Sequence, residues 1–561
     1  MPDSALSHVT RAAALSAMAA EPVDLLVIGG GITGAGIARD AALRGIRTAL
    51  VDKGDFAAGT SSASSRLIHG GLRYLDTGDF RLVFESSRER RVLLGIAPHL
   101  VWPLPFLFPV YRGARVPPWK LRAGMWLYDA LATFRNVHRH RWLGPAATRR
   151  LEPQLRDRDL RGAALYYDAQ TDDARLVLAT LRSAAAAGAL VANYAAATSL
   201  LKPDGRVRGA VVRDAFTGDA RTVRALVVVN ATGPWCDGLR RQDRAGAPPL
   251  LRLTRGAHVA VPRARIGHSH AVTLTSPLDG RVMFVLPWGD VSYIGTTDID
   301  DPGDADHVRA TAADVTYLLR SANAYFPNAR LTPADVIATW AALRALVTTS
   351  PQARASAVSR EHVIEESASG LLTIAGGKLT TYRTMATELV DRVAVRLQDV
   401  DGRPRAPAPP TDREPLPGGE TARPDVLEPA LREQGASPGT AEHLVRCYGS
   451  EAPAVLNRAK RNRVLLGPIA EGRPEIRAEV EHVVEREMAM RLGDVLMRRL
   501  HLFWQTADQG LGAAPAVARK LRELLGWDAE REAAELAAYR DEVAQARACL
   551  GPVAAAGPAA D

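Results

Sequence analysis

The feature that most constrains the fold is a glycine-rich turn near the N-terminus, between an apolar run and a helical pattern. Residues 23–28 are apolar apart from one aspartate and lead into Gly29-x-Gly31-x-x-Gly34. A helical pattern rich in alanine follows, and a second apolar run then ends in Asp52, 18 residues after Gly34. This order of strand, glycines, helix, strand and acid predicts a βαβ unit that binds a nucleotide.

Each part of this unit has a physical role in binding a dinucleotide. The glycines let the backbone turn tightly and approach a pyrophosphate, whose charge is favoured at a helix N-terminus. Asp52 can accept hydrogen bonds from an adenosine ribose, and no arginine stands beside it, which leaves FAD or NAD as the cofactor. Two later glycine junctions, at residues 227–235 and 374–383, favour FAD, although a tight turn would explain either one alone.

A segment dense in hydroxyl groups follows the βαβ unit. Residues 60–75 read TSSASSRLIHGGLRYL. Hydroxyls and exposed amides suit a flavin diphosphate, whereas His69, Arg73 and Tyr74 suit a polar, anionic substrate. The composition is also compatible with a serine-rich loop, so both interpretations stay open on composition alone.

The composition indicates a globular protein with anionic partners. Of 561 residues, 24% are charged and 47% are hydrophobic, and the formal net charge is +9. This charge suits a phosphorylated substrate or an acidic lipid surface, whereas the lack of a long basic tract argues against nucleic acid. The three cysteines lie far apart in the sequence and predict neither a disulfide framework nor a metal site. No apolar run approaches the roughly 18–20 residues of a membrane-spanning helix.

Several sequence blocks together resemble the FAD-dependent glycerol-3-phosphate dehydrogenases. The blocks are GGGITGAGIARDAALRG, TSSASSRLIHGGLRYL, DDARLVL, VNATGPW, RGAHVAVP, IGTTD, SPQAR…SR and GGKLTTYRTMA, and they follow the family's order between about residues 24 and 385. SSASSRLIHGGLRYL is highly specific to this family, whereas GxGxxG and NATGPW are shared with other flavoproteins of the glycine-oxidase type. Residues 491–499 resemble the family's C-terminal cap more weakly.

The resemblance implies a function as well as a fold. It implies that the protein oxidises sn-glycerol 3-phosphate to dihydroxyacetone phosphate by hydride transfer to FAD, and passes the electrons to membrane quinone in glycerol and glycerophospholipid metabolism. It also implies a cytoplasmic protein that attaches peripherally to the anionic inner face of the plasma membrane, with a homodimer left open. The alternative is an oxidase that uses oxygen and gives peroxide. A non-catalytic or tRNA-modifying flavoprotein is a third, less favoured hypothesis.

The expected architecture is α/β, with a Rossmann-like FAD-binding domain of the glycine-oxidase or glutathione-reductase type, an inserted mixed-sheet substrate domain and a helical C-terminal domain. The predicted divisions are a disordered leader at 1–21, the FAD-binding domain at 22–75, 160–235 and 355–400, the substrate domain at 76–159 and 236–354, a proline-rich linker at 401–424, the C-terminal domain at 425–548 and a disordered tail at 549–561. Predicted strands cover 207–212, 225–229, 281–286 and 371–374, and predicted helices cover 175–187 and 382–397.

The resemblance also identifies site residues. The catalytic candidates are His258, His69, Arg344 and Lys378, and the substrate-binding candidates are Arg73, Tyr74, Arg344, Arg360 and His258. His258 is the first candidate for the general base, because an unperturbed histidine titrates near neutrality. Arginine suits a dianionic phosphate because it donates two hydrogen bonds at once. The cofactor-binding candidates are Gly29, Gly31, Thr33, Gly34, Asp52, Thr60, Ser61, Ser62, Ser64, Ser65, Leu67, His69, Ala231, Thr232, Gly233, Gly376, Gly377, Lys378, Leu379 and Thr380.

Residues 100–142 leave one question open. They contain nine of the 31 aromatic residues of the chain, interleaved with arginine and lysine. Packing under a large sheet would explain this mixture, and so would a surface that contacts a membrane.

Overall fold

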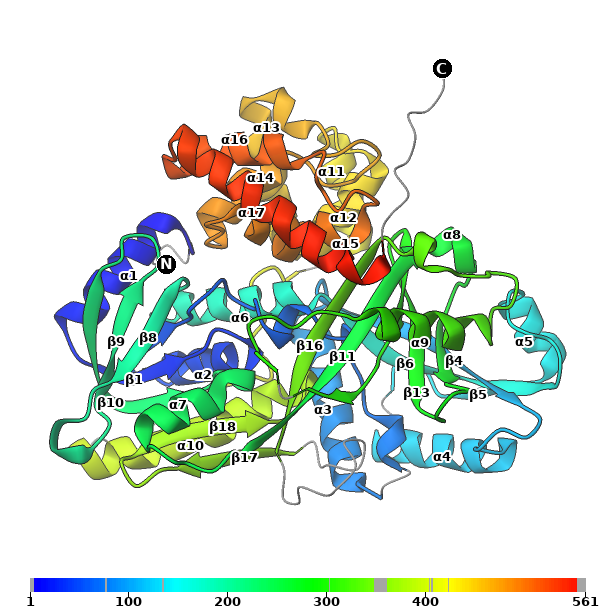
Figure 1. The fold of residues 1–561 in the computed structure, drawn as a ribbon, viewed down its shortest axis with the longest axis horizontal. Coiled ribbons are helices and arrows are strands. Elements are labelled where there is room, and N and C mark those ends of the chain that lie inside the picture. Colours follow the sequence, from blue (N-terminus) through cyan, green and yellow to red (C-terminus); the bar gives the residue numbers. More distant parts are fainter. Residues whose placement is uncertain are drawn as a thin grey trace.

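In the computed structural model, two β-sheets lie side by side and a bundle of helices covers one side of their junction (Figure 1). The structure describes residues 5–75, 78–133, 136–301, 303–347, 361–402, 404, 407–421 and 423–551. The α/β architecture expected from the sequence, with two sheets and a helical C-terminal domain, is confirmed.

The first sheet has a parallel centre. Its strand order is β17 (His362–Glu366), β18 (Leu371–Gly376), β10 (Ala220–Asn230), β1 (Val23–Ile28), β2 (Thr48–Val51) and β7 (Leu190–Ala192), with β8 (Ala195–Leu200) and β9 (Gly209–Asp214) joined through β10. The strands from β18 to β7 are parallel, so their carboxyl ends share one edge of the sheet. Every residue of β1 is buried, because strands pair with both of its edges and helices cover the sheet.

Helices cover both faces of this sheet. On one face α2 (Ile32–Leu43), α6 (Asp173–Ala186) and α10 (Tyr382–Asp401) share a continuous apolar core with the strands. On the other face α1 (His8–Ala20) and α7 (Cys236–Asp243) pack against them. This arrangement leaves the carboxyl edge of the parallel strands as the place where a ligand can bind.

The second sheet is mixed. Its order is β15 (Ile299–Asp300), β11 (Leu251–Pro262), β14 (Val291–Gly295), β13 (Val282–Trp288), β12 (Ala271–Thr275), β4 (Val101–Tyr111), β6 (Leu160–Thr171) and β3 (Leu67–Ile68), while β16 (Ala338–Val347) pairs with β11 and β5 (Arg141–Leu143) with β6. The helices around it are α3 (Phe80–Ile96), α4 (Pro118–Leu131), α5 (Pro145–Leu151), α8 (Arg263–Ile266) and α9 (Ala312–Asn323).

One predicted boundary is wrong. The prediction places residues 160–235 in the FAD-binding domain, but β6 pairs with β4 along its length and belongs to the second sheet. The short β3, within predicted segment 22–75, also pairs with β6. The chain therefore crosses between the sheets as often as expected, but the first crossing comes before β3 and the second comes after β6, because a strand pattern does not reveal which sheet a strand joins.

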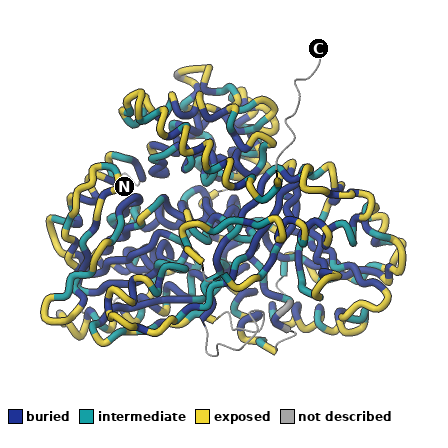
Figure 2. The backbone as a smooth tube through the Cα atoms, in the orientation of Figure 1, coloured by how far each residue is buried: buried dark blue, intermediate teal, exposed yellow. Residues whose placement is uncertain are grey.

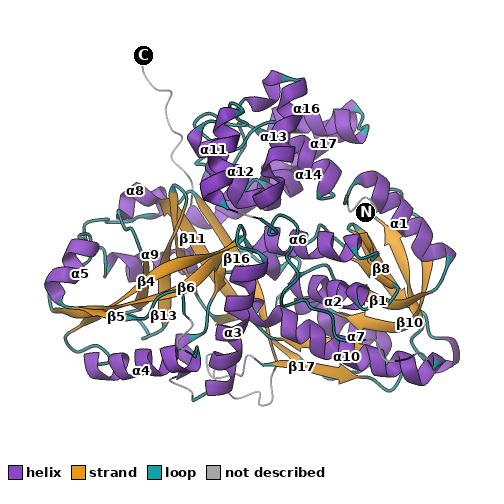
Figure 3. Ribbon diagram, turned by 180° about the vertical axis from the view of Figure 1, so that it is seen from behind, coloured by secondary structure: helices purple, strands orange, loops and turns teal. Residues whose placement is uncertain are grey.

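The C-terminal domain is helical. Its helices are α11 (Pro424–Glu433), α12 (Pro438–Tyr448), α13 (Ala452–Arg461), α14 (Ala478–Arg486), α15 (Leu502–Gln505), α16 (Ala514–Leu525) and α17 (Ala529–Arg547), with a π-helical turn at Asp494–Arg499. Figure 3 shows these helices gathered on one side of the two sheets. Residues of α14 to α17 share an apolar core with the second sheet, so this domain does not pack independently.

The expectation of a disordered leader is wrong for residues 8–20. Ser7 caps α1 by accepting a hydrogen bond from the Thr10 N–H. Arg11 then donates to both carboxylate oxygens of Asp214, at 2.8 and 3.1 Å, in a buried pair. The linker is also held in place, because Arg39 donates to the Glu414 carbonyl at 2.8 Å. Residues 552–561 of the predicted tail lie outside the described residues.

The aromatic span at residues 100–142 divides between core and surface. Phe106 and Tyr128 are buried, whereas Trp119 is 72% exposed and Trp126 is 58% exposed. Figure 2 shows the contrast between the buried strands and the exposed outer helices. Core packing is therefore confirmed for Phe106 and Tyr128, whereas contact of the exposed tryptophans with a membrane stays a prediction.

Three further findings concern the described part of the chain. Cys236, Cys447 and Cys549 are free thiols. No described group of three or more potential ligands is arranged to hold a metal ion. Among the described helices, none combines the length and apolar character needed to cross a membrane.

Candidate functional site

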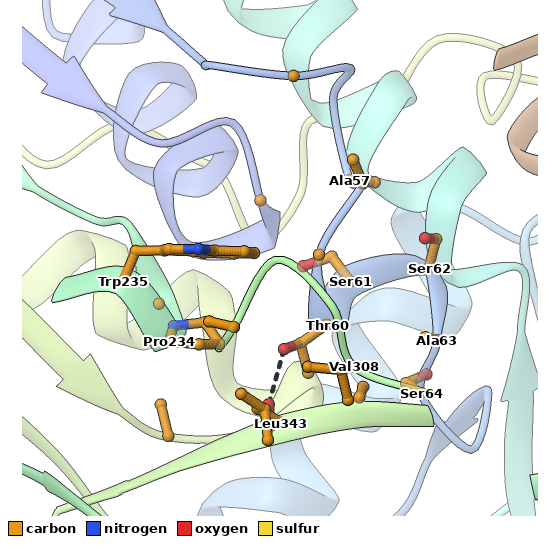
Figure 4. Close-up of a pocket in the computed structure, with 18 of the residues that line it drawn as sticks. Ala57, Thr60, Ser61, Ser62, Ala63, Ser64, Pro234, Trp235, Val308 and Leu343 are labelled. Atoms are coloured by element: carbon orange, nitrogen blue, oxygen red, sulfur yellow. Dashed lines mark hydrogen bonds between the residues drawn. The ribbon is translucent and has the colours of Figure 1, made fainter. Parts of the chain in front are cut away.

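A cavity of about 1430 Å³ lies where the two sheets meet the C-terminal domain. This volume exceeds the 300–1,000 Å³ typical of small-ligand pockets, so it has room for a dinucleotide and a substrate together. The glycine junctions at residues 29–31 and 376–377 both line it. Figure 4 shows how the hydroxyl-rich segment faces Pro234 and Trp235 across part of this cavity.

The nucleotide end of the cavity is built largely from backbone. Gly29 has a φ of 115°, and a Cβ there would lie 2.5 Å from the Ala231 carbonyl oxygen. Gly31 is the N-cap residue of α2, and as a glycine it has no side chain that could hydrogen-bond to the helix N-terminus. Ile32 donates its N–H to Ser61 Oγ at 3.0 Å. The close turn and the helix N-terminus together form a cradle suited to a diphosphate.

Asp52 lies at the end of β2 in the same cavity. Its two carboxylate oxygens accept hydrogen bonds from the Gly30 N–H at 2.6 Å and the Gly54 N–H at 2.8 Å. Burial raises the pKa of Asp52 to about 6, although the two hydrogen bonds act to lower it. The backbone thus fixes the carboxylate where a ribose hydroxyl can donate to it.

Several hydroxyls of residues 60–65 also form hydrogen bonds to other parts of the protein. Thr60 Oγ1 donates to the Leu343 carbonyl at 2.7 Å, which ties the segment to β16 (Figure 4). Ser64 Oγ donates to Asp173 Oδ2 at 2.7 Å, at the start of α6. The segment is therefore a braced wall of the cavity rather than an open serine-rich loop.

His258 lines the same cavity from β11 of the second sheet. Its Nε2 is 2.9 Å from Ser65 Oγ, and its ring stacks on Trp340 with centroids 5.1 Å apart and planes at 14°. Burial, with the charges of Arg344 and Arg66, lowers the pKa of His258 to about 3. The near-neutral titration of an unperturbed histidine therefore does not apply at this buried position, which favours the neutral ring.

Arg344 on β16 is aimed by a buried carboxylate. It donates to Asp298 Oδ1 at 2.7 Å, to the Thr297 carbonyl at 3.1 Å and to Thr296 Oγ1 at 3.0 Å. Burial would raise the pKa of Asp298, but Arg344 and Arg281 hold that pKa at about 2. The guanidinium thus keeps a fixed direction at the cavity wall.

Lys378 lies at the second glycine junction. Its Nζ is 3.7 Å from the ring centroid of Tyr74 and 3.4 Å from Ser86 Oγ. Gly377 has a φ of 84°, and a Cβ there would lie 2.3 Å from Met385 Sδ. The lack of a side chain at this position therefore lets β18 turn into α10 beside the cavity.

Most of the predicted site residues line this one cavity. In addition to the residues described above, the lining includes the predicted residues Thr33, Ser62, Leu67, His69, Thr232, Gly233, Leu379 and Thr380. Gly34 is not part of the lining. It packs α2 against the turn, since a Cβ there would lie 1.9 Å from the Gly29 carbonyl oxygen. The side chain of Arg73 and all of Arg360 lie outside the described residues.

A buried ion cluster, which no sequence motif indicates, braces the cofactor loop. Asp55, three residues after Asp52, accepts hydrogen bonds from Arg498 Nε at 2.6 Å and Arg499 Nη2 at 3.0 Å. Burial would raise the pKa of the Asp55 carboxyl, but Arg499 and Arg498 outweigh burial and hold it below its ordinary value. The C-terminal domain therefore fixes a wall of the nucleotide site from a distant part of the chain.

A second unpredicted contact lies in the wall of the cavity. Asp306 accepts a hydrogen bond from Trp235 Nε1 at 3.0 Å and pairs with Lys53. Arg309 on the same loop donates to Glu542 of α17 at 3.0 Å. The loop thus links the nucleotide end to the C-terminal domain.

Comparisons with known proteins agree with this geometry. Residues 24–383 match the family described as FAD dependent oxidoreductase, and residues 409–532 match the C-terminal domain of alpha-glycerophosphate oxidase. The glycerol-3-phosphate dehydrogenase of Mycobacterium leprae is 39% identical over 546 residues, which cover 97% of this chain and 92% of that protein. The glycerol-3-phosphate dehydrogenase of Synechocystis sp. is 37% identical, covering 93% of this chain and 96% of that protein.

A solved structure extends the likeness to three dimensions. The glycerol-3-phosphate dehydrogenase from Bacillus halodurans, in complex with FAD, superposes with a TM-score of 0.81 and 32% identity. The match covers 98% of this chain and 99% of that one, so it includes both sheets and the helical domain.

Proposed function

The chain belongs to the family of FAD-dependent glycerol-3-phosphate dehydrogenases, and from this premise we propose that it oxidises sn-glycerol 3-phosphate to dihydroxyacetone phosphate and passes the electrons to a membrane quinone. FAD is the cofactor, and the cradle of Gly29, Gly31 and Ala231 with Asp52 fits its diphosphate and ribose. FAD supplies the hydride acceptor when bound, while the chain supplies position and charge.

Arg344 is the residue we assign to the substrate phosphate. A dianionic phosphate requires a fixed cation, and Asp298 fixes the direction of this guanidinium. Lys378 adds a second cation at the same cavity, held over the ring of Tyr74. With both charges in place, glycerol 3-phosphate is favoured over uncharged glycerol.

His258 is the residue we assign to the proton of the C2 hydroxyl, with His69 as the second candidate. A neutral imidazole can accept this proton. Burial, Arg344 and Arg66 disfavour the imidazolium in the protein alone, but a bound dianionic phosphate favours it. Substrate binding would therefore raise the pKa of His258 towards the range in which it acts as a base.

One observation carries the proposal: Arg344, Lys378 and His258 line the same cavity as the dinucleotide cradle. The test is an assay of the purified, fully flavinated protein with glycerol 3-phosphate and an artificial electron acceptor, with glycerol as the control. Turnover with the phosphorylated substrate alone is expected. Full flavin content without turnover would overturn the proposal.

For the acceptor we propose quinone, reached by docking on the anionic inner face of the plasma membrane. Support comes from the α3–α4 surface, which we define by its exposed apolar residues Phe80, Phe84, Trp119, Trp126 and Leu127. Lys120 and Arg122 are exposed beside the two tryptophans. Such a mixture of aromatic and basic side chains is typical of a protein that binds at a membrane interface. In Figure 1 these helices lie on the side away from the C-terminal bundle.

Vesicle binding tests this docking. Cosedimentation with anionic vesicles should fall as salt rises, because the screening length shortens to ~3 Å at about 1 M salt. Trp119→Ser with Trp126→Ser should weaken binding, whereas Val464→Ser, an exposed valine in the C-terminal domain, should not. No binding to anionic or neutral vesicles, together with one peroxide per turnover in air, would favour the oxygen-using oxidase.

A further inference from the structure

A short segment of the C-terminal domain, residues 501–504, contacts Trp340, which stacks on His258, and Trp288, over which Arg66 lies next to Ser65. It leaves the π-helical turn at His501, whose φ is 59°, and continues into α15. His501 and Trp504 are buried, and Trp504 belongs to the apolar core shared with the second sheet. Trp504 also lines the cavity, so the segment forms part of the wall at its substrate end, where His258 and Arg344 lie.

Trp504 forms the first of two links to His258. Its indole Nε1 donates to the Met497 carbonyl at 2.8 Å, which fixes the ring. The ring meets Trp340 nearly edge to face, with centroids 5.5 Å apart. Trp340 stacks on His258, at 5.1 Å and 14°. Trp340 is thus held between a C-terminal tryptophan and the active-site histidine.

His501 forms the second link. Its Nε2 lies 2.5 Å from Asp172 Oδ2, just before α6, and its ring lies 5.4 Å from that of Trp288. Arg66 stacks over the same Trp288 at 3.9 Å, and forms an ion pair with Asp173 at 3.0 Å. Arg66 directly follows Ser65, whose hydroxyl is the hydrogen-bond partner of His258.

We propose that residues 501–504 are a positioning element for the oxidation: Trp504 holds Trp340 behind the His258 ring, and His501 braces the turn that carries Ser65. Neither residue is catalytic. The C-terminal domain thereby acts on the substrate end of the cavity as well as on the nucleotide loop. The kinetic part of the test rests on the proposed function.

The kinetic test compares Trp504→Ala, Trp504→Phe and a matched control, Trp527→Ala, in flavinated protein. Trp527 is a half-buried tryptophan of the same domain that is not in the cavity lining. Loss of an aromatic contact predicts a fall in kcat per flavin of about 3- to 10-fold for Trp504→Ala. Trp504→Phe should recover most of the rate, and KM should change little because Arg344 keeps its partners.

The pH profile separates positioning from general loosening. If Trp340 loosens in Trp504→Ala, water reaches His258 and the burial that lowers its pKa weakens. The acidic limb of kcat/KM should then move to higher pH in Trp504→Ala, but not in Trp527→Ala. A fall in activity that only follows lost flavin would overturn the proposal.

Hydrogen exchange gives a readout that does not need turnover. Faster amide exchange is expected at residues 64–66 and 338–341 in Trp504→Ala, relative to Trp527→Ala. If the wild-type protein does not turn over, the proposed function fails while this comparison still tests the positioning. Equal exchange and equal kcat in the two alanine variants would overturn the positioning role.

Discussion

The nucleotide end of the cavity is formed mainly by backbone groups, whereas the substrate end is formed mainly by side chains. At the nucleotide end, Gly29 and Gly34 bring backbone close to backbone, and Asp52 is itself held by two backbone N–H groups. At the substrate end, His258 and Arg344 are side chains held by other side chains from several strands. A backbone cradle has no room to adjust, whereas a side chain that loses one partner keeps its others. We therefore expect all-or-none effects at the first end and graded effects at the second.

The largest effect is expected for Gly34→Ala. A Cβ at this position would lie 1.9 Å from the Gly29 carbonyl oxygen, so α2 must move away from the turn. We expect loss of bound flavin, measured by absorbance of the purified protein. Gly95→Ala in α3 is the matched control, because a Cβ there meets nothing within 4 Å. The control should keep its flavin and gain about 0.5–1 kcal/mol of stability. Full flavin content in Gly34→Ala would contradict the all-or-none effect expected at the nucleotide end.

The next effect is expected for Arg344→Ala. Loss of a charge-assisted contact to phosphate should raise KM for glycerol 3-phosphate roughly 30- to 150-fold, with flavin content unchanged. Arg344→Lys should fall between the two, since it keeps the charge but not the paired donors. Arg252→Ala is the control, because Arg252 pairs with Asp300 outside the cavity lining. An unchanged KM would remove Arg344 from the phosphate site.

A smaller effect is expected from pH at the nucleotide end. Burial raises the pKa of Asp52 from 3.8 to about 6, so the stability that this group contributes decreases as pH rises between about 4 and 6. Ribose hydroxyls donate to the ionised form, so FAD affinity should fall by up to about tenfold for each pH unit below 6. Fluorescence titration of FAD from pH 5 to 7.5 measures this. Asp52→Asn should bind weakly, with a flat profile.

The smallest effect is expected for Ser65→Ala. His258 would lose one hydrogen bond but keep its stacking on Trp340, so kcat should fall about 2- to 10-fold with unchanged flavin. Ser199→Ala, on the exposed part of β8, should change nothing. A complete loss of activity in Ser65→Ala would show that the substrate end is as intolerant as the nucleotide end.

The difference between local backbone signals and long-range side-chain contacts also explains which features could be predicted from the sequence. The βαβ unit was predictable because glycine spacing and apolar runs are local signals, and β1, α2 and β2 follow them. The placement of β6 was not predictable, because strand periodicity is the same in either sheet. The position of α1 was not predictable, because one of the contacts that hold it, between Arg11 and Asp214, joins residues 203 positions apart.

The site follows the same rule. Its glycines and hydroxyls were identified from motifs, and most of them line the cavity. The neutral state of His258 was missed because burial and the two nearby arginines are tertiary properties. The Asp298 carboxylate that aims Arg344, and the arginines that hold Asp55, were also missed, since no local pattern links them.

The bond between Asp55 and Arg499 joins residues 444 positions apart, and this has a consequence for how the enzyme is made. At about 5–20 residues per second, the ribosome completes Arg499 roughly 20–90 s after Asp55. During that interval the nascent chain already contains the glycine turn and Asp52, but its cofactor loop has no C-terminal brace. Flavin taken up before Arg499 emerges would be held by an unfinished site, so stable loading has to wait for the C-terminal domain.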